Sequence, residues 1–265
     1  MIRFLAFITL SATVALARPE PASITMEWTI DGEKREAIVI PPSKKTDVAI
    51  PVVLVFHGHG GTMKLMERKG FQTQWPEALI VCPQGLPTVT LRDLEGKKAG
   101  WQNTAGTNKD RDLKFVDAIL KTVRDKHKVD DARIYATGHS NGGGFTYLLL
   151  AERGKEFAAF APTAATGGSV RLGKDVKPAP LLHVAGEKDE IVPFASQKRT
   201  LEMMRKLNGC DGEGKEWAKS GPLVGTLYPS KTGTPVVEVI HPGTHQYPEQ
   251  APELIVKFFK EQAKK

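Results

Sequence analysis

The sequence contains little cysteine: Cys82 and Cys210 are the only two in 265 residues. So few cysteines exclude a small fold stapled by several disulfides. Neither cysteine has neighbours at the spacing of metal ligands, so we expect no metal site around them. Two cysteines are able to pair in an exported protein, but Cys82 falls in an expected buried strand. The sequence therefore leaves a Cys82–Cys210 disulfide open.

Apolar runs of transmembrane length are also missing. The chain starts with a short basic segment, Met1 to Arg3, followed by an apolar run from Phe4 to Leu16 that ends in Ala15-Leu16-Ala17. This pattern predicts a signal peptide over residues 1–17 and a secreted or periplasmic mature chain. The alternative is an uncleaved membrane anchor. Beyond this segment we expect no stable membrane association.

Blocks of basic residues interleaved with aromatics are absent as well. The 37 Lys and Arg exceed the 30 Asp and Glu, which gives a net charge of +7, and this becomes +6 if Arg3 is removed with residues 1–17. The basic residues are scattered along the chain. We therefore expect no nucleic-acid partner.

Apolar strand patterns and helix patterns alternate along residues 18–265, which predicts one α/β domain with a mostly parallel sheet and helices on both faces. The run Pro-Val-Val-Leu-Val-Phe is typical of a strand buried on both faces. Strands are expected at 24–30, 35–40, 51–56, 78–82, 132–137, 157–162, 180–185, 223–228 and 236–240, and helices around 116–123, 145–150, 194–207 and from 252. Two segments, 83–106 and 208–222, are expected to be loops.

The central motif is Gly138-His139-Ser140-Asn141-Gly142, between an expected strand and an expected helix. A G-x-S-x-G motif in this context indicates a sharp turn that exposes the serine as a nucleophile. The alternative is a glycine-rich turn in which Ser140 only caps the helix.

A nucleophilic serine needs a base and an orienting acid. The loop after the strand at 180–185 offers Asp189, with Glu187 and Glu190 as rivals. The loop after the last strand offers His245, with His241 as its rival. We favour Asp189 and His245, because the order Ser…Asp…His is that of α/β hydrolases. His127, His139 and His183 are interpreted as structural or surface residues.

The loop His57-Gly58-His59-Gly60-Gly61 follows the buried strand. In this position such a loop supplies one oxyanion-hole N–H, which we assign to His59, and the residue after the nucleophile, Asn141, supplies the other. A metal pair at His57 and His59 is disfavoured, because no further ligand is near in sequence. Trp101, in the long loop, is a candidate for stacking on a substrate ring or for a packing anchor.

The resulting mechanism is ester hydrolysis through an acyl-enzyme, and it requires no cofactor. A serine peptidase or thioesterase, or a non-catalytic binding protein on the same scaffold, are the alternatives. A binding role would not require an intact set of Ser140, Asp189 and His245.

The motifs Val129-Asp130-x-x-Arg133 to Gly143, Gly-x-x-Asp189-x-x-Val-Pro and Gly243-Thr-His245-x-Tyr-Pro248 resemble the exported polyhydroxybutyrate depolymerase and feruloyl esterase-like proteins, including carbohydrate esterase family 1. The resemblance implies an α/β-hydrolase fold, secretion, and hydrolysis of aryl or acetyl esters on plant polysaccharides, or of polyester chains. Small ester, polysaccharide or polyester substrates are the partners it implies. Many relatives have Cys at the position of His59 and Trp at that of Tyr247.

Overall fold

A computed structural model describes residues 22–44, 47–168, 176–210 and 212–264. The expected signal peptide, residues 1–17, lies outside the described residues. Within them, no helix is long and apolar enough to cross a membrane.

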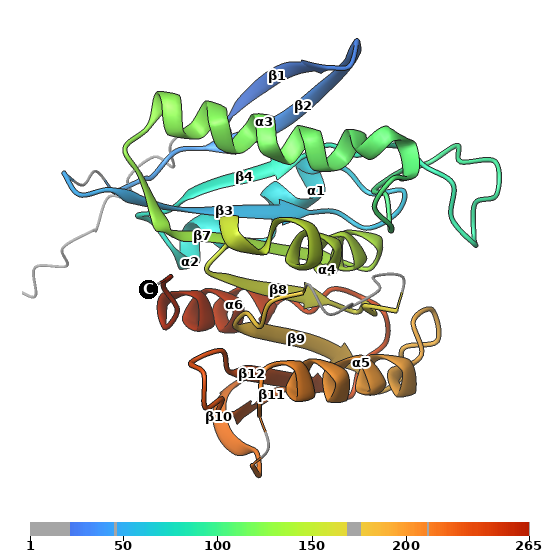
Figure 1. Cartoon of the computed structure of the whole chain (residues 1–265), viewed down its shortest axis with the longest axis vertical. Coiled ribbons are helices and arrows are strands. Elements are labelled where there is room, and N and C mark those ends of the chain that lie inside the picture. Colours follow the sequence, from blue (N-terminus) through green and yellow to red (C-terminus); the bar gives the residue numbers. More distant parts are fainter. Residues whose placement is uncertain (1–21, 45–46, 169–175, 211, 265) are drawn as a thin grey trace, which may run out of the picture.

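A ten-stranded sheet forms the centre of the molecule (Figure 1). Its six central strands are parallel, and antiparallel strands extend it at both edges. In spatial order the strands are β1 (Ile24–Ile30), β2 (Glu33–Ile40), β4 (Leu79–Pro83), β3 (Ile50–Phe56), β7 (Val129–His139), β8 (Ala159–Thr163), β9 (Leu181–Gly186), β12 (Val236–His241), β11 (Leu223–Tyr228) and β10 (Lys215–Ser220).

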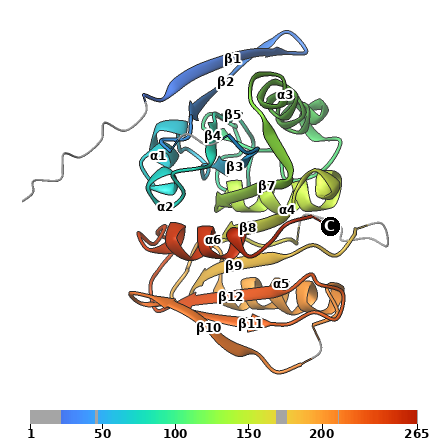
Figure 2. The same ribbon diagram turned by 90° about the vertical axis from the view of Figure 1, so that its left-hand side faces the viewer.

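Helices cover both faces of this sheet (Figure 2). The helices α3 (Arg111–Lys126), α4 (Asn141–Arg153) and α5 (Phe194–Leu207) contribute to one apolar cluster. The helices α1 (Met63–Glu67), α2 (Phe71–Gln74) and α6 (Ala251–Lys260) contribute to the other. Two short 3-10 turns, η1 (Thr107–Asp110) and η2 (Gly154–Glu156), flank α3 and α4. This is the α/β-hydrolase architecture that the sequence predicts.

Strand β3 shows why the central strands are apolar throughout. Its side chains alternate between the two clusters, with Val52, Leu54 and Phe56 in one and Val53 and Val55 in the other. A strand covered by helices on both faces has no solvent-facing side, so a polar residue would be buried at either position. The continuous apolar run of β3 is therefore a consequence of the helices that cover both faces of the sheet.

The two segments expected to be loops contain more structure than the sequence indicates. Strands β5 (Leu86–Pro87) and β6 (Ala99–Gly100) pair in a small hairpin within 83–106. Strand β10 lies within 208–222 and pairs with β11, so the prediction of a loop is wrong there. β10 is a polar edge strand with a half-exposed pattern, which hydrophobic periodicity does not reveal.

Cys82 and Cys210 lie in different apolar clusters, on opposite faces of the sheet. They are not joined by a disulfide. Burial raises the pKa of the Cys82 thiol, so this side chain behaves as a small apolar residue.

Candidate active site

Ser140 occupies the turn between β7 and α4 with φ +54° and ψ −118°, a strained backbone conformation for a residue with a side chain. Close packing forces this turn. A Cβ atom on Gly138 would lie 2.3 Å from the carbonyl oxygen of Gly142, and one on Gly142 would lie 2.5 Å from the carbonyl oxygens of Phe56 and His57. Glycine is required at both positions because any side chain would push the strand, turn and helix apart.

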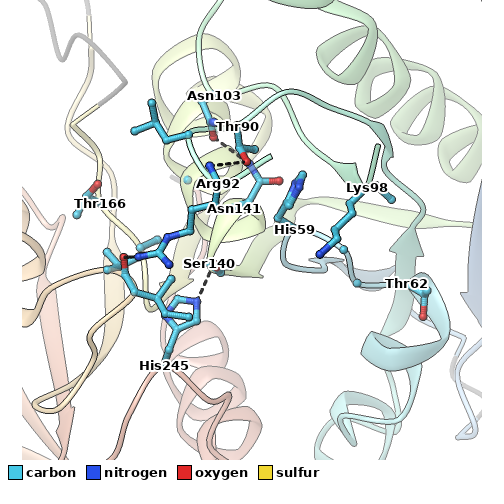
Figure 3. A pocket seen from close by; sticks show the side chains of 18 of the residues that line it. His59, Thr62, Thr90, Arg92, Lys98, Asn103, Ser140, Asn141, Thr166 and His245 are labelled. Carbon is cyan, nitrogen blue, oxygen red and sulfur yellow. Dashed lines mark hydrogen bonds between the residues drawn. The ribbon is translucent and has the colours of Figure 1, made fainter. Parts of the chain in front are cut away.

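Three side chains form a continuous hydrogen-bonded line from three strand ends. His245 Nε2 lies 2.8 Å from Ser140 Oγ, and His245 Nδ1 lies 2.8 Å from Asp189 Oδ2 (Figure 3 shows the serine and histidine). Ser140 follows β7, Asp189 follows β9 and His245 follows β12. The parallel strands point the same way, so their carboxyl ends deliver all three residues to one edge of the sheet.

Backbone hydrogen bonds between two loops bring the base to the acid. Glu187 N donates to His241 O at 2.9 Å, and Lys188 N donates to Gly243 O at 3.0 Å. Close contact between the loops requires Gly186, where a Cβ would lie 2.6 Å from the carbonyl oxygens of Gly243 and Thr244. The loop that carries Asp189 and the loop that carries His245 therefore form one unit.

The carboxylate of Asp189 is buried and fully hydrogen-bonded. Its Oδ1 accepts from Ile191 N at 2.9 Å and Val192 N at 2.8 Å, and its Oδ2 accepts from Gln197 Nε2 at 3.0 Å as well as from His245. Four donors surround the carboxylate and fix its direction. A carboxylate held in this way can orient the imidazole and stabilise its positive charge.

The rival candidates lie elsewhere. Glu187 and Glu190 are exposed, and within the described residues neither carboxylate forms a hydrogen bond with a histidine side chain. His241 is buried at the end of β12, and its Nδ1 accepts from Gly243 N at 3.1 Å. The His139 ring lies tilted beside that of His245, with ring centroids 5.0 Å apart. The structure thus brings together Ser140, Asp189 and His245 from the sequence candidates.

A buried chain of hydrogen-bonded side chains extends from Asp189 into the core, and no sequence motif predicts it. Gln197 Nε2 donates to Asp189. His183 Nε2 lies 2.9 Å from Gln197 Oε1, and Tyr147 Oη lies 2.7 Å from His183 Nδ1. Gln197 Oε1 is an acceptor, so His183 carries its proton on Nε2 and accepts from Tyr147 on Nδ1. Every donor in this chain points toward Asp189.

We expect Gln197→Leu to lower kcat by about ten- to a hundredfold while KM changes little, because Asp189 loses a buried donor that positions it. Tyr147→Phe removes a hydrogen bond further from the triad and is expected to lower kcat less. Steady-state kinetics with circular dichroism as a folding check measures both. An equal fall for both variants, accompanied by equal loss of thermal stability, would contradict the positioning role.

The two assigned oxyanion donors lie beside Ser140 at the cavity. The backbone N–H groups of His59 and Asn141 donate no hydrogen bond to any described residue. Asn141 begins α4, so its N–H also lies at the positive end of the helix dipole. The Asn141 side chain is structural: Oδ1 accepts from Trp101 N at 2.7 Å and Nδ2 donates to Trp101 O at 3.0 Å.

His57, which the sequence placed only in the oxyanion loop, holds that loop in shape. Its Nε2 accepts from Gly85 N at 2.9 Å, so Nδ1 carries the proton and donates to Gly58 O at 2.7 Å. Burial lowers the pKa of His57, which keeps this tautomer neutral. Within the described residues, no group of three or more His, Cys, Asp or Glu side chains is arranged to hold a metal ion.

Trp101 does not contact the cavity, which corrects its assignment as a substrate-binding residue. Its side chain is fully buried at 0% exposure, stacks on Phe145 with centroids 5.3 Å apart, and donates from Nε1 to His57 O at 2.9 Å. The alternative interpretation, a packing anchor, is the correct one. Trp101 stabilises the oxyanion loop, because its Nε1 donates a hydrogen bond to the carbonyl oxygen of His57 in that loop.

The site opens into a cavity of about 990 Å³. Its walls come from the oxyanion loop, the β5–β6 hairpin, the turn at Ser140 and the loops after β8 and β9. The lining residues are His59, Gly60, Gly61, Thr62, Gln84, Thr90, Leu91, Arg92, Lys98, Ala99, Asn103, Ser140, Asn141, Gly144, Ala165, Thr166, Ile191, Val192 and His245 (Figure 3).

Histidines whose pKa is lowered around the site predict acid sensitivity of the fold. Burial lowers the pKa of His57, that of His139 to about 3 and that of His183 to about 4. In the unfolded chain each has a pKa of about 6.5, so below that pH the unfolded state binds protons that the folded state does not. The contribution of these histidines to the free energy of unfolding is therefore fully present above pH ~6.5. As the pH decreases below that value, the free energy of unfolding decreases by about 1.4 kcal/mol per pH unit for each fully titrating histidine.

Urea unfolding between pH 7 and pH 5 tests this expectation, with His183→Gln as the comparison. The variant lacks one titrating group, so its free energy of unfolding should fall less steeply with decreasing pH. Equal slopes for the two proteins would contradict the assignment of a neutral, buried His183.

A strained serine elbow, a hydrogen-bonded Ser–His–Asp line and a doubly covered parallel sheet together define an α/β hydrolase. Known proteins agree with this class. The acetyl xylan esterase from Aspergillus awamori superposes with a TM-score of 0.63 over 89% of this chain and 99% of its own, at 11% identity. In sequence, the chain is similar to feruloyl esterases C and D.

Two curated relatives illustrate this similarity. The probable feruloyl esterase C of Aspergillus niger is 31% identical over 187 residues, which cover 66% of this chain and 63% of that protein. Feruloyl esterase D of Neurospora crassa is 26% identical over 267 residues, which cover 92% of this chain and 89% of that protein. The chain thus spans less than two thirds of the length of the first relative. No protein-family model matches it.

Proposed function

We propose that this chain is a serine carboxylester hydrolase that cleaves feruloyl or acetyl esters of plant polysaccharides through an acyl-enzyme. The observation that carries the proposal is the line of hydrogen bonds from Ser140 through His245 to Asp189 at the edge of an open cavity. The similarity to feruloyl esterases and to an acetyl xylan esterase supports these ester classes.

In the proposed reaction, His245 Nε2 removes the proton of Ser140 as Oγ attacks the ester carbonyl carbon. The His59 and Asn141 N–H groups donate to the resulting oxyanion. Asp189 holds His245 in the tautomer that carries a proton on Nδ1 and stabilises its charged form. The histidine then gives its Nε2 proton to the departing alcohol. Water, activated by the same histidine, hydrolyses the acyl-enzyme and restores Ser140.

The predicted segment 1–17 supports export of the mature protein, secreted or periplasmic, where polymeric substrates are found. This part of the proposal rests on the sequence pattern alone. N-terminal sequencing of the protein recovered outside the cytoplasm tests it, and a mature chain that still begins at Met1 would contradict it.

A panel of esters tests the substrate class: a short-chain p-nitrophenyl ester, methyl ferulate, an acetylated xylan oligomer and a hydroxybutyrate oligomer. We expect turnover of the p-nitrophenyl ester and of methyl ferulate or acetylated xylan. Preference for the hydroxybutyrate oligomer would favour a polyester hydrolase instead. Cleavage of peptides and no ester would favour a peptidase, and turnover of nothing would overturn the proposal.

A further inference from the structure

The cavity wall is positively charged. Among the described residues that line it, Arg92 and Lys98 carry full positive charges, and none is an aspartate or glutamate. A cleft lined by charge of one sign attracts ligands of the opposite sign. Hydrolysis of a neutral ester by the Ser140 mechanism requires neither cation.

Lys98 lies beside the oxyanion loop with its charge unpaired. Its aliphatic stem passes Gly60, where an added Cβ would lie 3.4 Å from Lys98 Cδ, and Gly60 N donates to Ala99 O at 2.7 Å. In Figure 3 the ammonium points into the cavity, below His59. Within the described residues no carboxylate lies within 4 Å of this ammonium, whereas the neighbouring Lys97 pairs with Glu95.

Arg92, in the loop between β5 and β6, reaches into the same cavity on the other side of Ser140 (Figure 3). A guanidinium nitrogen lies 3.4 Å from the carbonyl oxygen of Ile191, and no carboxylate of the described residues pairs with it (Figure 3). Guanidinium has five N–H donors, so most remain for a ligand. Such a fork suits the two oxygens of a carboxylate.

Asp93, which follows Arg92 in the sequence, is already engaged by other donors. Asp93 accepts from Lys97 N at 3.2 Å, from Lys98 N at 2.9 Å and from His59 Nε2 at 3.0 Å. Its carboxylate therefore fixes the loop against the oxyanion loop and leaves the charges of Arg92 and Lys98 to the cavity.

We propose that Lys98 and Arg92, which lie on either side of Ser140 (Figure 3), favour ester substrates that carry a carboxylate close to the scissile bond, as on a uronic acid of an acidic polysaccharide. The inference rests on the proposed function and narrows its substrate class to esters that carry a negative charge close to the scissile bond.

Two matched pairs of substrates test this, and they place the charge on either side of the ester. For the acyl side, p-nitrophenyl hexanoate is compared with the mono-p-nitrophenyl ester of adipic acid. For the alcohol side, methyl para-acetoxybenzoate is compared with para-acetoxybenzoate. We expect kcat/KM to favour the anionic member of at least one pair by about tenfold at low salt, and this preference to shrink as salt screens the charges.

Single-residue variants test whether Lys98 and Arg92 cause the preference for anionic esters. Lys98→Met and Arg92→Met are each expected to reduce the ratio of anionic to neutral kcat/KM by about three- to tenfold. Lys97→Met, which removes a neighbouring charge outside the cavity lining, should leave that ratio unchanged.

Equal turnover of both members of each pair by the unaltered protein would overturn the inference, as would an equal loss of preference in Lys97→Met and Lys98→Met. In both cases, hydrolysis of the neutral members that depends on Ser140 keeps the proposed function intact. Failure to hydrolyse any member of either pair, anionic or neutral, would instead overturn the proposed function itself.

Discussion

Ser140→Ala is expected to lower kcat for p-nitrophenyl acetate by about four to six orders of magnitude. The variant lacks the oxygen that attacks the carbonyl, and no other described nucleophile lies within hydrogen-bond distance of His245 Nε2. The oxyanion donors and the cavity remain, so a small rate above that of water should persist. Initial rates of p-nitrophenol release, measured at saturating substrate, give the effect.

The fold must survive this substitution for the result to be informative. Alanine removes one hydroxyl at a half-exposed position, so we expect the melting temperature to change by only a few degrees. Activity within tenfold of the unaltered protein in a folded Ser140→Ala variant would exclude Ser140 as the nucleophile.

His245→Ala is expected to cause a loss of similar size, about four to six orders of magnitude in kcat. Without the imidazole, Ser140 has no base at 2.8 Å and Asp189 has no partner to orient. Because the two residues act as a unit, the double variant should lose no more than either single variant. The same p-nitrophenyl acetate assay compares the three proteins.

His241→Asn serves as the matched control, because His241 is the other histidine at the end of the last strand and lies near Asp189. We expect it to retain activity within about tenfold, since its Nδ1 accepts only from Gly243 N. If His241→Asn were inactive and His245→Ala active, the roles assigned to the two histidines would be reversed.

The sequence predicted the site to the extent that local pattern determines it. The strand–glycine–serine–glycine–helix pattern around Ser140 predicts the turn correctly. Gly138 and Gly142 pack against backbone atoms, so only glycine fits at these two positions, and the glycines can be read directly from the sequence. Asp189 and His245 were placed by their positions after parallel strands, since parallel strands share a carboxyl edge. Strand β3 was recognisable because both of its faces are covered.

Other features depend on contacts between distant segments, and local pattern does not carry them. Gln197 lies on an ordinary amphipathic helix, and only the packing of α5 against β9 brings its amide to Asp189. Trp101 sits in a polar, glycine-rich segment, and only the fold shows that it is buried against Phe145. Strand β10 lies at the edge of the sheet and is polar, so its sequence has no apolar strand pattern. It forms a strand because it pairs with β11.

Labelling with a fluorophosphonate probe, followed by peptide mass analysis, tests the central claim most directly, because the probe reacts with an activated serine and needs no knowledge of the substrate. We predict one modified peptide, containing Ser140, in the unaltered protein, and no labelling in Ser140→Ala or His245→Ala. Modification of a different serine, or no labelling of a folded protein that also turns over no ester, would contradict the assignment of Ser140 as the nucleophile of a serine hydrolase.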